Sequence, residues 1–339
     1  MGDIPSRPSI GIPGDFTPVV VGYGRAGRLH HRCLSAVAGD HVDVVIVDPV
    51  RPAQLAPKTR WLPTVRDALE TVDPNLAVFH VTTPVRAHIS TTKRLAAAGA
   101  QHIILEKPMA ETREDAYQVT TLARAGVQLI PVAVWPASVV TQQVKRIITD
   151  GAIGDIVAIR FEQSKPRFGQ SRHDLAHTSA FQVELPHQIL LALHLAGPVA
   201  AVQDVVRWPL TYPDGSSLRD RGGVKLTLVH RSGIRCVLVS DLCSPVRMRR
   251  LQVRGVRELI AHFPIGDDQV GHVRMPGGRW TVVHDAPLTQ FISSAYLSFA
   301  KAPDTLGVDL SMHLQTMEIL ETAINSAVGL ARDEAIDAW

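Results

Sequence analysis

The sequence VVVGYGRAG, residues 19–27, indicates the fold of the first part of the chain. An apolar strand pattern runs directly into glycines spaced as Gly22-x-Gly24-x-x-Gly27, and a helical pattern follows. In such a turn the first glycine permits the sharp bend, the second lets a pyrophosphate approach the backbone, and the third lets the helix meet the strand. The N-terminus of the helix then faces the phosphates. We therefore expect a dinucleotide to be bound by Gly22, Tyr23, Gly24, Arg25, Ala26 and Gly27.

A lone carboxylate, Asp48, ends the next strand pattern, residues 42–48. It lies about 20 residues after the glycine turn, at the place of the acidic residue that accepts hydrogen bonds from a ribose 2′-hydroxyl. A carboxylate there repels a 2′-phosphate, so the sequence predicts NAD rather than NADP as the cofactor. Arg51 lies close by and could help hold a 2′-phosphate, which leaves NADP open.

Strand and helix patterns alternate as far as residue 134, and beyond about residue 150 the pattern changes to strands with period two. The strand patterns are residues 76–81, 102–105 and 128–134, and the helical patterns are residues 65–70, 87–98 and 114–125. This alternation predicts a doubly wound parallel sheet. Later, residues 224–230 and 234–240 alternate with period two on either side of a turn, and residues 311–330 form a last helix. The sequence predicts an α/β Rossmann domain followed by an α+β domain with an open, mainly antiparallel sheet.

The composition is that of an ordinary soluble globular protein. The chain has 339 residues, 45% of them hydrophobic, and a formal net charge of +3. This charge creates no strong field for nucleic acid or a membrane surface, so neither is expected as a partner. The three cysteines, Cys33, Cys236 and Cys243, form no metal-like spacing, and the N-terminus has no apolar signal segment. We therefore expect a cytoplasmic protein.

Residues 76–112, LAVFHVTTPVRAHISTTKRLAAAGAQHIILEKPMAET, resemble the core of the Gfo/Idh/MocA oxidoreductases. The resemblance lies in the Thr83-Pro84 turn, in His88, and in Glu106-Lys107-Pro108, and it continues through residues 144–156 and 183–197. It implies cofactor contacts from Thr82, Thr83, Pro84, His88, Glu106 and Lys107. It also implies that the terminal helix returns to the Rossmann domain. The expected parts are a flexible leader (1–17), an NAD-binding domain (18–135), a substrate and oligomerisation domain (136–310) and the returning helix (311–339).

Lys107 and His187 are the expected catalytic residues. A lysine at the carboxyl edge of a parallel sheet, followed by a proline that fixes the backbone, can polarise or protonate a substrate oxygen beside a nicotinamide. The resemblance implies that His187 acts as acid or base, commonly with an aspartate four residues earlier in the family. Here that position is Val183, and we expect Glu184 to orient the imidazole instead.

The polar loop of residues 164–179 is expected to border the substrate. Trp135 could stack on a sugar ring or on the nicotinamide, and packing at the domain joint is an equal alternative. A metal site at His173, Asp174 and His177 has neither a helix signature nor a cysteine partner, so no metal is expected. The expected substrate-binding residues are Lys107, Trp135, Arg172, Asp174, His177, Glu184 and His187.

Together these features predict an NAD-dependent dehydrogenase that oxidises a secondary hydroxyl of a sugar, aminosugar or cyclitol to a ketone. An aminoglycoside, and with it a role in antibiotic biosynthesis, is one hypothesis, motivated by Asp174 and Glu184. Two alternatives stay open: an NADPH-dependent reductase of a keto-sugar, and a catalytically silent NAD-binding sensor. The resemblance also implies a homodimer or homotetramer.

Overall fold

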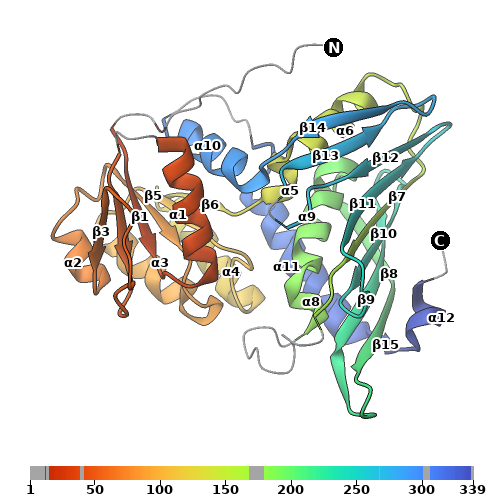
Figure 1. Cartoon of the computed structure of the whole chain (residues 1–339), viewed down its shortest axis with the longest axis horizontal. Coiled ribbons are helices and arrows are strands. Elements are labelled where there is room, and N and C mark those ends of the chain that lie inside the picture. The colour runs from red at the N-terminus through yellow and green to blue at the C-terminus, as the bar shows by residue number, and fades with distance from the viewer. Residues whose placement is uncertain are drawn as a thin grey trace. The chain divides into compact units, whose positions relative to one another are not determined.

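The computed structural model describes residues 12, 15–38, 42–167, 179–266, 268–300 and 306–336. Contacts divide the chain into two units, each with its own sheet (Figure 1). The first unit comprises Met1–Val132 and Leu288–Leu306, and the second comprises Ala133–Pro287 and Gly307–Trp339. Among the described residues, no helix has both the length and the apolar character needed to cross a membrane.

The first unit contains a fully parallel sheet in the order β3-β2-β1-β4-β5-β6. Its strands are β1 (Thr17–Val21), β2 (Val44–Val47), β3 (Thr59–Leu62), β4 (Ala77–Val81), β5 (His102–Leu105) and β6 (Gln128–Pro131). Its helices are α1 (Arg25–Ala38), α2 (Val65–Leu69), the short 3₁₀ helix η2 (Val85–Ala87), α3 (His88–Ala97), α4 (Arg113–Arg124) and α10 (Pro287–Phe299). The predicted doubly wound parallel sheet is therefore confirmed.

The strand order reverses at β1, which pairs with β2 on one side and with β4 on the other. Open α/β sheets bind ligands at such a switch point, outside the carboxyl ends of the strands. The central strands are buried along their whole length, as the VVIV sequence of β2 illustrates. Side chains buried on both faces produce the continuous apolar runs from which these strands were predicted.

The second unit contains a mixed sheet in the order β14-β13-β12-β11-β7-β10-β9-β8-β15. Its strands are β7 (Ala158–Ser164), β8 (Val199–Thr211), β9 (Ser217–His230), β10 (Arg235–Asp241), β11 (Met248–Arg254), β12 (Glu258–His262), β13 (Val270–Arg274), β14 (Trp280–His284) and β15 (Val328–Gly329). Most neighbours are antiparallel, but β10 with β7 and β15 with β8 are parallel. The predicted hairpin of residues 224–240 is confirmed, with Val229 opposite Arg235.

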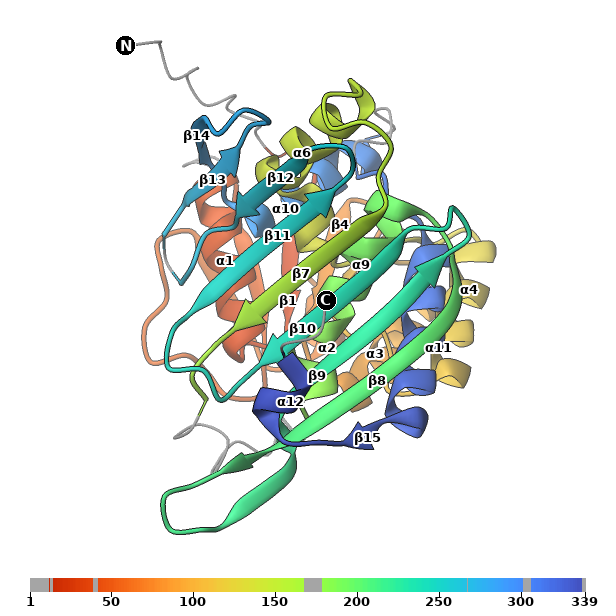
Figure 2. The ribbon, with the colours of Figure 1, turned by 90° about the vertical axis from the view of Figure 1, so that its right-hand side faces the viewer.

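The helices of the second unit lie on both faces of this sheet. They are α5 (Val134–Ala137), α6 (Val139–Thr149), α8 (Ala180–Val183), α9 (Leu185–Ala196), α11 (Leu310–Ser326) and α12 (Arg332–Ile336). One face is covered by α9 and α11, and the short α12 lies on the other (Figures 1 and 2). The Lys225 ammonium beneath α12 donates to the Ala335 carbonyl at 2.9 Å. Part of this second face is thus covered by the chain's own C-terminal segment.

The sequence pattern of residues 183–196 predicts a single helix, but the backbone of Glu184 is not helical and divides this segment. The physical reason is Pro186, which has no N–H to donate and fits a helix only in its first turn. A new helix, α9, therefore begins at Leu185. The expected site residues Glu184 and His187 lie at this junction.

The helix α10 groups with the Rossmann sheet. The Tyr296 ring of α10 contacts Phe16, and Phe299 contacts His102 on β5. By contrast, α11 packs against α9 and β8 and buries Met317, Ile319, Leu320 and Ala323. The helix predicted over residues 311–330 is observed as far as Ser326, and Ile324 on its predicted apolar face is exposed. Its expected packing on the Rossmann domain stays a prediction.

Candidate active site

The glycine turn after β1 forms an open cradle. A Cβ on Gly27 would lie 2.0 Å from the Gly22 carbonyl oxygen, so only glycine lets α1 approach this closely. Gly22 itself has a φ of 94°, which favours glycine. At Gly24 an added Cβ would meet nothing within 4 Å. The backbone is therefore accessible where a pyrophosphate is expected, and this space fits a dinucleotide.

Thr82 and Thr83 line the turn after β4, beside the glycine turn. The Thr82 hydroxyl donates to the Gly22 carbonyl at 2.6 Å, which ties the two turns together. The Thr83 hydroxyl oxygen is buried and makes no hydrogen bond with any residue in the described ranges. It is thus a candidate polar contact for the dinucleotide, and Pro84 follows it directly.

Asp48 follows β2 and is tied to the glycine turn. Its Oδ2 accepts a hydrogen bond from the Tyr23 backbone N–H at 2.7 Å, and its Oδ1 accepts from Val50 N at 2.9 Å. These bonds fix the direction of the carboxylate, and each oxygen keeps a lone pair for a ribose hydroxyl. The Cζ of Arg51 lies 5.6 Å from the centre of the Trp61 ring.

The remaining residues of the glycine turn, Tyr23, Arg25 and Ala26, contact α1 or belong to it. The Tyr23 hydroxyl lies 2.8 Å from His31 Nδ1, so this side chain is anchored to the helix and only its backbone faces Asp48. Arg25 and Ala26 begin α1, whose first turn carries no acidic residue. The N–H groups there are oriented for an anion, as the sequence predicts.

His88 joins the turns that follow β4 and β5. Its Nε2 lies 2.9 Å from the Thr83 carbonyl and its Nδ1 lies 3.1 Å from the Pro108 carbonyl. Burial lowers the pKa of His88, although the hydrogen bond to Thr83 and the charge of Glu106 act in the opposite direction. His88 therefore positions both turns, and a direct contact with a cofactor stays a prediction.

Glu106 and Lys107 follow β5 at the same carboxyl edge of the sheet. The Glu106 Oε2 accepts a hydrogen bond from the Lys107 backbone N–H at 2.8 Å, and Oε1 lies 3.0 Å from His30 Nε2. The Lys107–Pro108 peptide bond is cis. Sequence reasoning missed His30 because a histidine inside a helix pattern carries no signal for a partner so far along the chain.

In the second unit, the Trp135 ring is packed on several sides. Trp135 is 5% exposed. Its ring centre lies 5.0 Å from that of Phe263, 6.3 Å from that of His187 and 5.0 Å from Arg249 Cζ. These contacts agree with the packing alternative. The indole N–H, however, has no hydrogen-bond partner among the described residues, so a polar contact with a substrate stays open.

Glu184 lies beside a lysine. Its Oε1 is 3.5 Å from Lys165 Nζ, and its side chain is 9% exposed. Its carbonyl accepts the His187 backbone N–H at 3.1 Å. The structure thus places Glu184 and His187 on adjacent turns, and the expected bond between their side chains stays a prediction.

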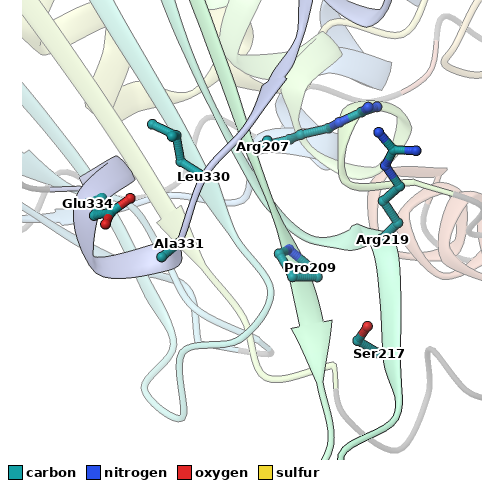
Figure 3. Close-up of a pocket in the computed structure, with 8 residues that line it drawn as sticks. Arg207, Pro209, Ser217, Arg219, Leu330, Ala331 and Glu334 are labelled. Atoms are coloured by element: carbon teal, nitrogen blue, oxygen red, sulfur yellow. The ribbon is translucent and has the colours of Figure 1, made fainter.

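The other expected substrate contacts, Arg172, Asp174 and His177, lie outside the described residues, as does His173. Within the described ranges, no group of three His, Cys, Asp or Glu side chains could hold a metal ion. A surface pocket of about 590 Å³ on the second unit is lined by β8, β9 and the C-terminal segment (Figure 3). It contains none of the expected site residues, and we assign it no part in the reaction.

Comparison with known proteins supports this arrangement. A family model described as an oxidoreductase family with an NAD-binding Rossmann fold, GFO_IDH_MocA, matches residues 16–132. A comparison with curated proteins gives no match.

Solved structures share the fold over nearly the whole chain. An oxidoreductase from Agrobacterium radiobacter, in complex with NAD⁺, L-tartaric acid and magnesium, has a TM-score of 0.70 and 17% identity. The alignment covers 92% of this chain and 96% of that one. KijD10, a 3-ketoreductase from Actinomadura kijaniata in complex with NADP and TDP-benzene, has a TM-score of 0.71 and 17% identity, over 93% of this chain and 99% of its own. The part of the chain that carries the glycine turn and Lys107 is thus similar, over residues 16–132, to the NAD-binding Rossmann domain of the Gfo/Idh/MocA oxidoreductases.

Proposed function

We propose that this NAD(P)-dependent oxidoreductase uses NAD to oxidise a secondary hydroxyl of a sugar, aminosugar or cyclitol to a ketone. The observation that carries the proposal is the shared carboxyl edge of the first sheet. There the open backbone at Gly24, the fixed carboxylate of Asp48 and Lys107 all follow parallel strands. A dinucleotide and a group that binds a substrate oxygen belong together at such an edge.

The reaction removes a hydride from carbon and a proton from oxygen. NAD, when bound by the glycine turn and Asp48, supplies the hydride acceptor. Lys107 hydrogen-bonds the substrate oxygen and stabilises the negative charge that develops there. His187 accepts the hydroxyl proton, and in the reverse direction it returns that proton to the ketone oxygen.

The cofactor preference is testable at Asp48. In Asp48→Asn the amide oxygen can keep one of the two backbone hydrogen bonds, while the negative charge is lost. Repulsion between charges a few ångström apart is on the order of 1–4 kcal/mol near a protein surface. We therefore expect the ratio of the dissociation constants of NADP and NAD to fall by about tenfold or more, measured by calorimetric titration.

Asp43→Asn is the matched control, because Asp43 is an exposed carboxylate just before β2. It should leave the ratio unchanged. Tighter binding of NADP than of NAD by the unaltered protein would contradict the proposed preference. It would favour the alternative, an NADPH-dependent reductase, for which KijD10 with its NADP is the structural precedent.

The substrate class is testable with a panel of free sugars, inositols and amino-bearing glycosides. Glu184 already lies beside the Lys165 ammonium, so the case for an amino group rests mainly on Asp174. We expect neutral sugars or cyclitols to reduce NAD. The reaction is measured by the absorbance of the reduced nicotinamide. Turnover of amino-bearing glycosides alone would restore the aminoglycoside hypothesis. Binding of NAD without turnover of any member would favour the reductase or the silent sensor.

We also propose a cytoplasmic homodimer or homotetramer. All three cysteines are free, and Cys33 and Cys236 are buried, which suits a reducing compartment.

A further inference from the structure

A series of four hydrogen-bonded polar side chains crosses the first unit and ends at Glu106. The Tyr296 hydroxyl of α10 lies 3.0 Å from His80 Nε2 on β4. His80 Nδ1 lies 2.9 Å from His30 Nδ1 on α1, and His30 Nε2 lies 3.0 Å from Glu106 Oε1. Tyr296, His80 and His30 are fully buried. These three residues, called here the histidine chain, have no part in the reaction proposed above.

Counting hydrogens gives the histidine chain a direction. An ionised carboxylate can only accept, so His30 must donate from Nε2. A neutral His30 then accepts at Nδ1, which requires His80 to donate from Nδ1. His80 in turn accepts at Nε2 and receives the Tyr296 hydroxyl hydrogen. In this order every N–H and O–H group of the histidine chain has an acceptor, and every ring nitrogen has a partner.

The reverse order leaves a hydrogen without an acceptor. If His30 carried a proton on both nitrogens, His80 would donate from Nε2 to the Tyr296 oxygen. The Tyr296 hydroxyl hydrogen would then point at no acceptor, because His80 is its one hydrogen-bond partner among the described residues. A buried donor without an acceptor is destabilising, and so is a buried charge. Burial also raises the pKa of Tyr296 and lowers that of His80, which keeps both neutral.

We propose that Tyr296, His80 and His30 are positioning residues that hold Glu106 ionised and in one orientation beside Lys107. The tautomer of His80 fixes that of His30, and the His30 N–H then holds one carboxylate oxygen while the Lys107 backbone N–H holds the other. Glu106 therefore cannot rotate, and the backbone of Lys107 is fixed with it. The link between these residues and catalysis rests on the proposed function. The predicted tautomers of His30 and His80 do not depend on it.

The charges around Glu106 agree with a permanently ionised carboxylate. Burial raises the pKa of Glu106, but the hydrogen bond from His30, the charge of Lys107 and the Lys107 backbone N–H act in the opposite direction, and the pKa lies below its ordinary value. His88, at the start of α3, is a further titratable group that interacts with the Glu106 charge. Without the His30 donor, burial would act with less opposition and the pKa of Glu106 would rise.

The first test reads the tautomers directly in the protein without cofactor. Long-range proton–nitrogen NMR spectra of histidine-labelled protein distinguish Nδ1–H from Nε2–H, and the signals are assigned with His30→Gln and His80→Asn. We expect His30 as Nε2–H and His80 as Nδ1–H at neutral pH. In Tyr296→Phe the His80 Nε2 resonance should shift, because it loses its donor. Thr120→Val is the matched control, since its hydroxyl donates to the Tyr117 carbonyl and has no other partner in the described part of the chain, and it should change neither signal.

The second test separates a positioning role from a merely structural one. His30→Leu removes the donor to Glu106, while His30→Gln can keep an N–H near the same place. With carbon-labelled glutamate, assigned by Glu106→Gln, we expect the pKa of Glu106 to rise in His30→Leu and to stay low in His30→Gln. The acidic limb of the pH profile of kcat/KM should move to higher pH in His30→Leu and should stay in place in His30→Gln.

The outcomes distinguish this inference from the proposed function. A doubly protonated His30, an Nε2–H tautomer of His80, or an unmoved pKa of Glu106 in folded His30→Leu would overturn the histidine chain even in an active enzyme. The expected tautomers and pKa change in a protein that transfers no hydride would reject the proposed function alone. If His30→Leu fails to fold, the tautomers observed in the unaltered protein and in Tyr296→Phe still test the histidine chain.

Discussion

Lys107→Met is expected to lower kcat/KM by about 10²–10⁴-fold, the range in which a positioned proton donor or acceptor contributes to catalysis. Methionine keeps the length and apolar stem of lysine but removes the ammonium that is proposed to contact the substrate oxygen. The backbone N–H of residue 107 can still donate to Glu106, as it does at 2.8 Å in the unaltered protein. The fold should therefore change little, and any loss of affinity for NAD reports the cofactor contact expected of the Lys107 side chain. Steady-state kinetics, thermal unfolding and NAD titration measure the three quantities.

Lys93→Ala is the control, because Lys93 is an exposed lysine on α3 of the same unit. It should leave kcat/KM unchanged. If Lys107→Met kept full turnover, Lys107 would not be catalytic. If the unaltered protein bound NAD but transferred no hydride with any substrate of the panel, the silent sensor would be the better explanation.

The elements predicted well from sequence are those whose burial produces a recognisable pattern of apolar residues within the element itself. The VVIV run of β2 is buried on both faces, and such strands appear as continuous β-branched residues. The TRWL sequence of β3 was missed because this edge strand is half-exposed and has no alternation. For α10 a signal was present, since Phe291, Ile292, Ala295 and Phe299 have helical spacing. Its place beside the Rossmann sheet, however, depends on contacts that no local pattern encodes.

The residues of the candidate site also divide into those that the sequence predicts and those that it does not. Gly22, Asp48 and Lys107 each follow a strand of the parallel sheet, so their positions relative to strand ends were sufficient to predict them. The histidine chain was not predictable, because Tyr296, His80 and His30 come from three segments that meet only in the folded unit. A buried histidine on a strand has the same sequence signature whether it packs alone or joins a network.

Two glycines of the same turn should separate folding from cofactor binding. In Gly27→Ala the new methyl group would lie 2.0 Å from the Gly22 carbonyl oxygen and 3.0 Å from the Thr82 hydroxyl. The shortest contact is with backbone, so α1 or the turn must move. We expect a loss of at least about 1–3 kcal/mol of unfolding free energy, as for an overpacked core, together with loss of NAD binding. Thermal unfolding and calorimetric titration with NAD measure the two effects.

Gly24→Ala is the matched change, with the same added methyl group placed in open space. We expect the unfolding temperature to stay that of the unaltered protein, because nothing in the chain is displaced. The affinity for NAD should nevertheless fall by about tenfold or more, since the methyl group occupies the path by which a pyrophosphate reaches the backbone. Unchanged affinity in Gly24→Ala would place the pyrophosphate elsewhere. Unchanged stability in Gly27→Ala would mean that α1 does not approach Gly22 as closely as the structure has it. Because the two variants differ only in what surrounds the methyl group, opposite results at Gly24 and Gly27 would show that one glycine serves the ligand and the other serves the fold.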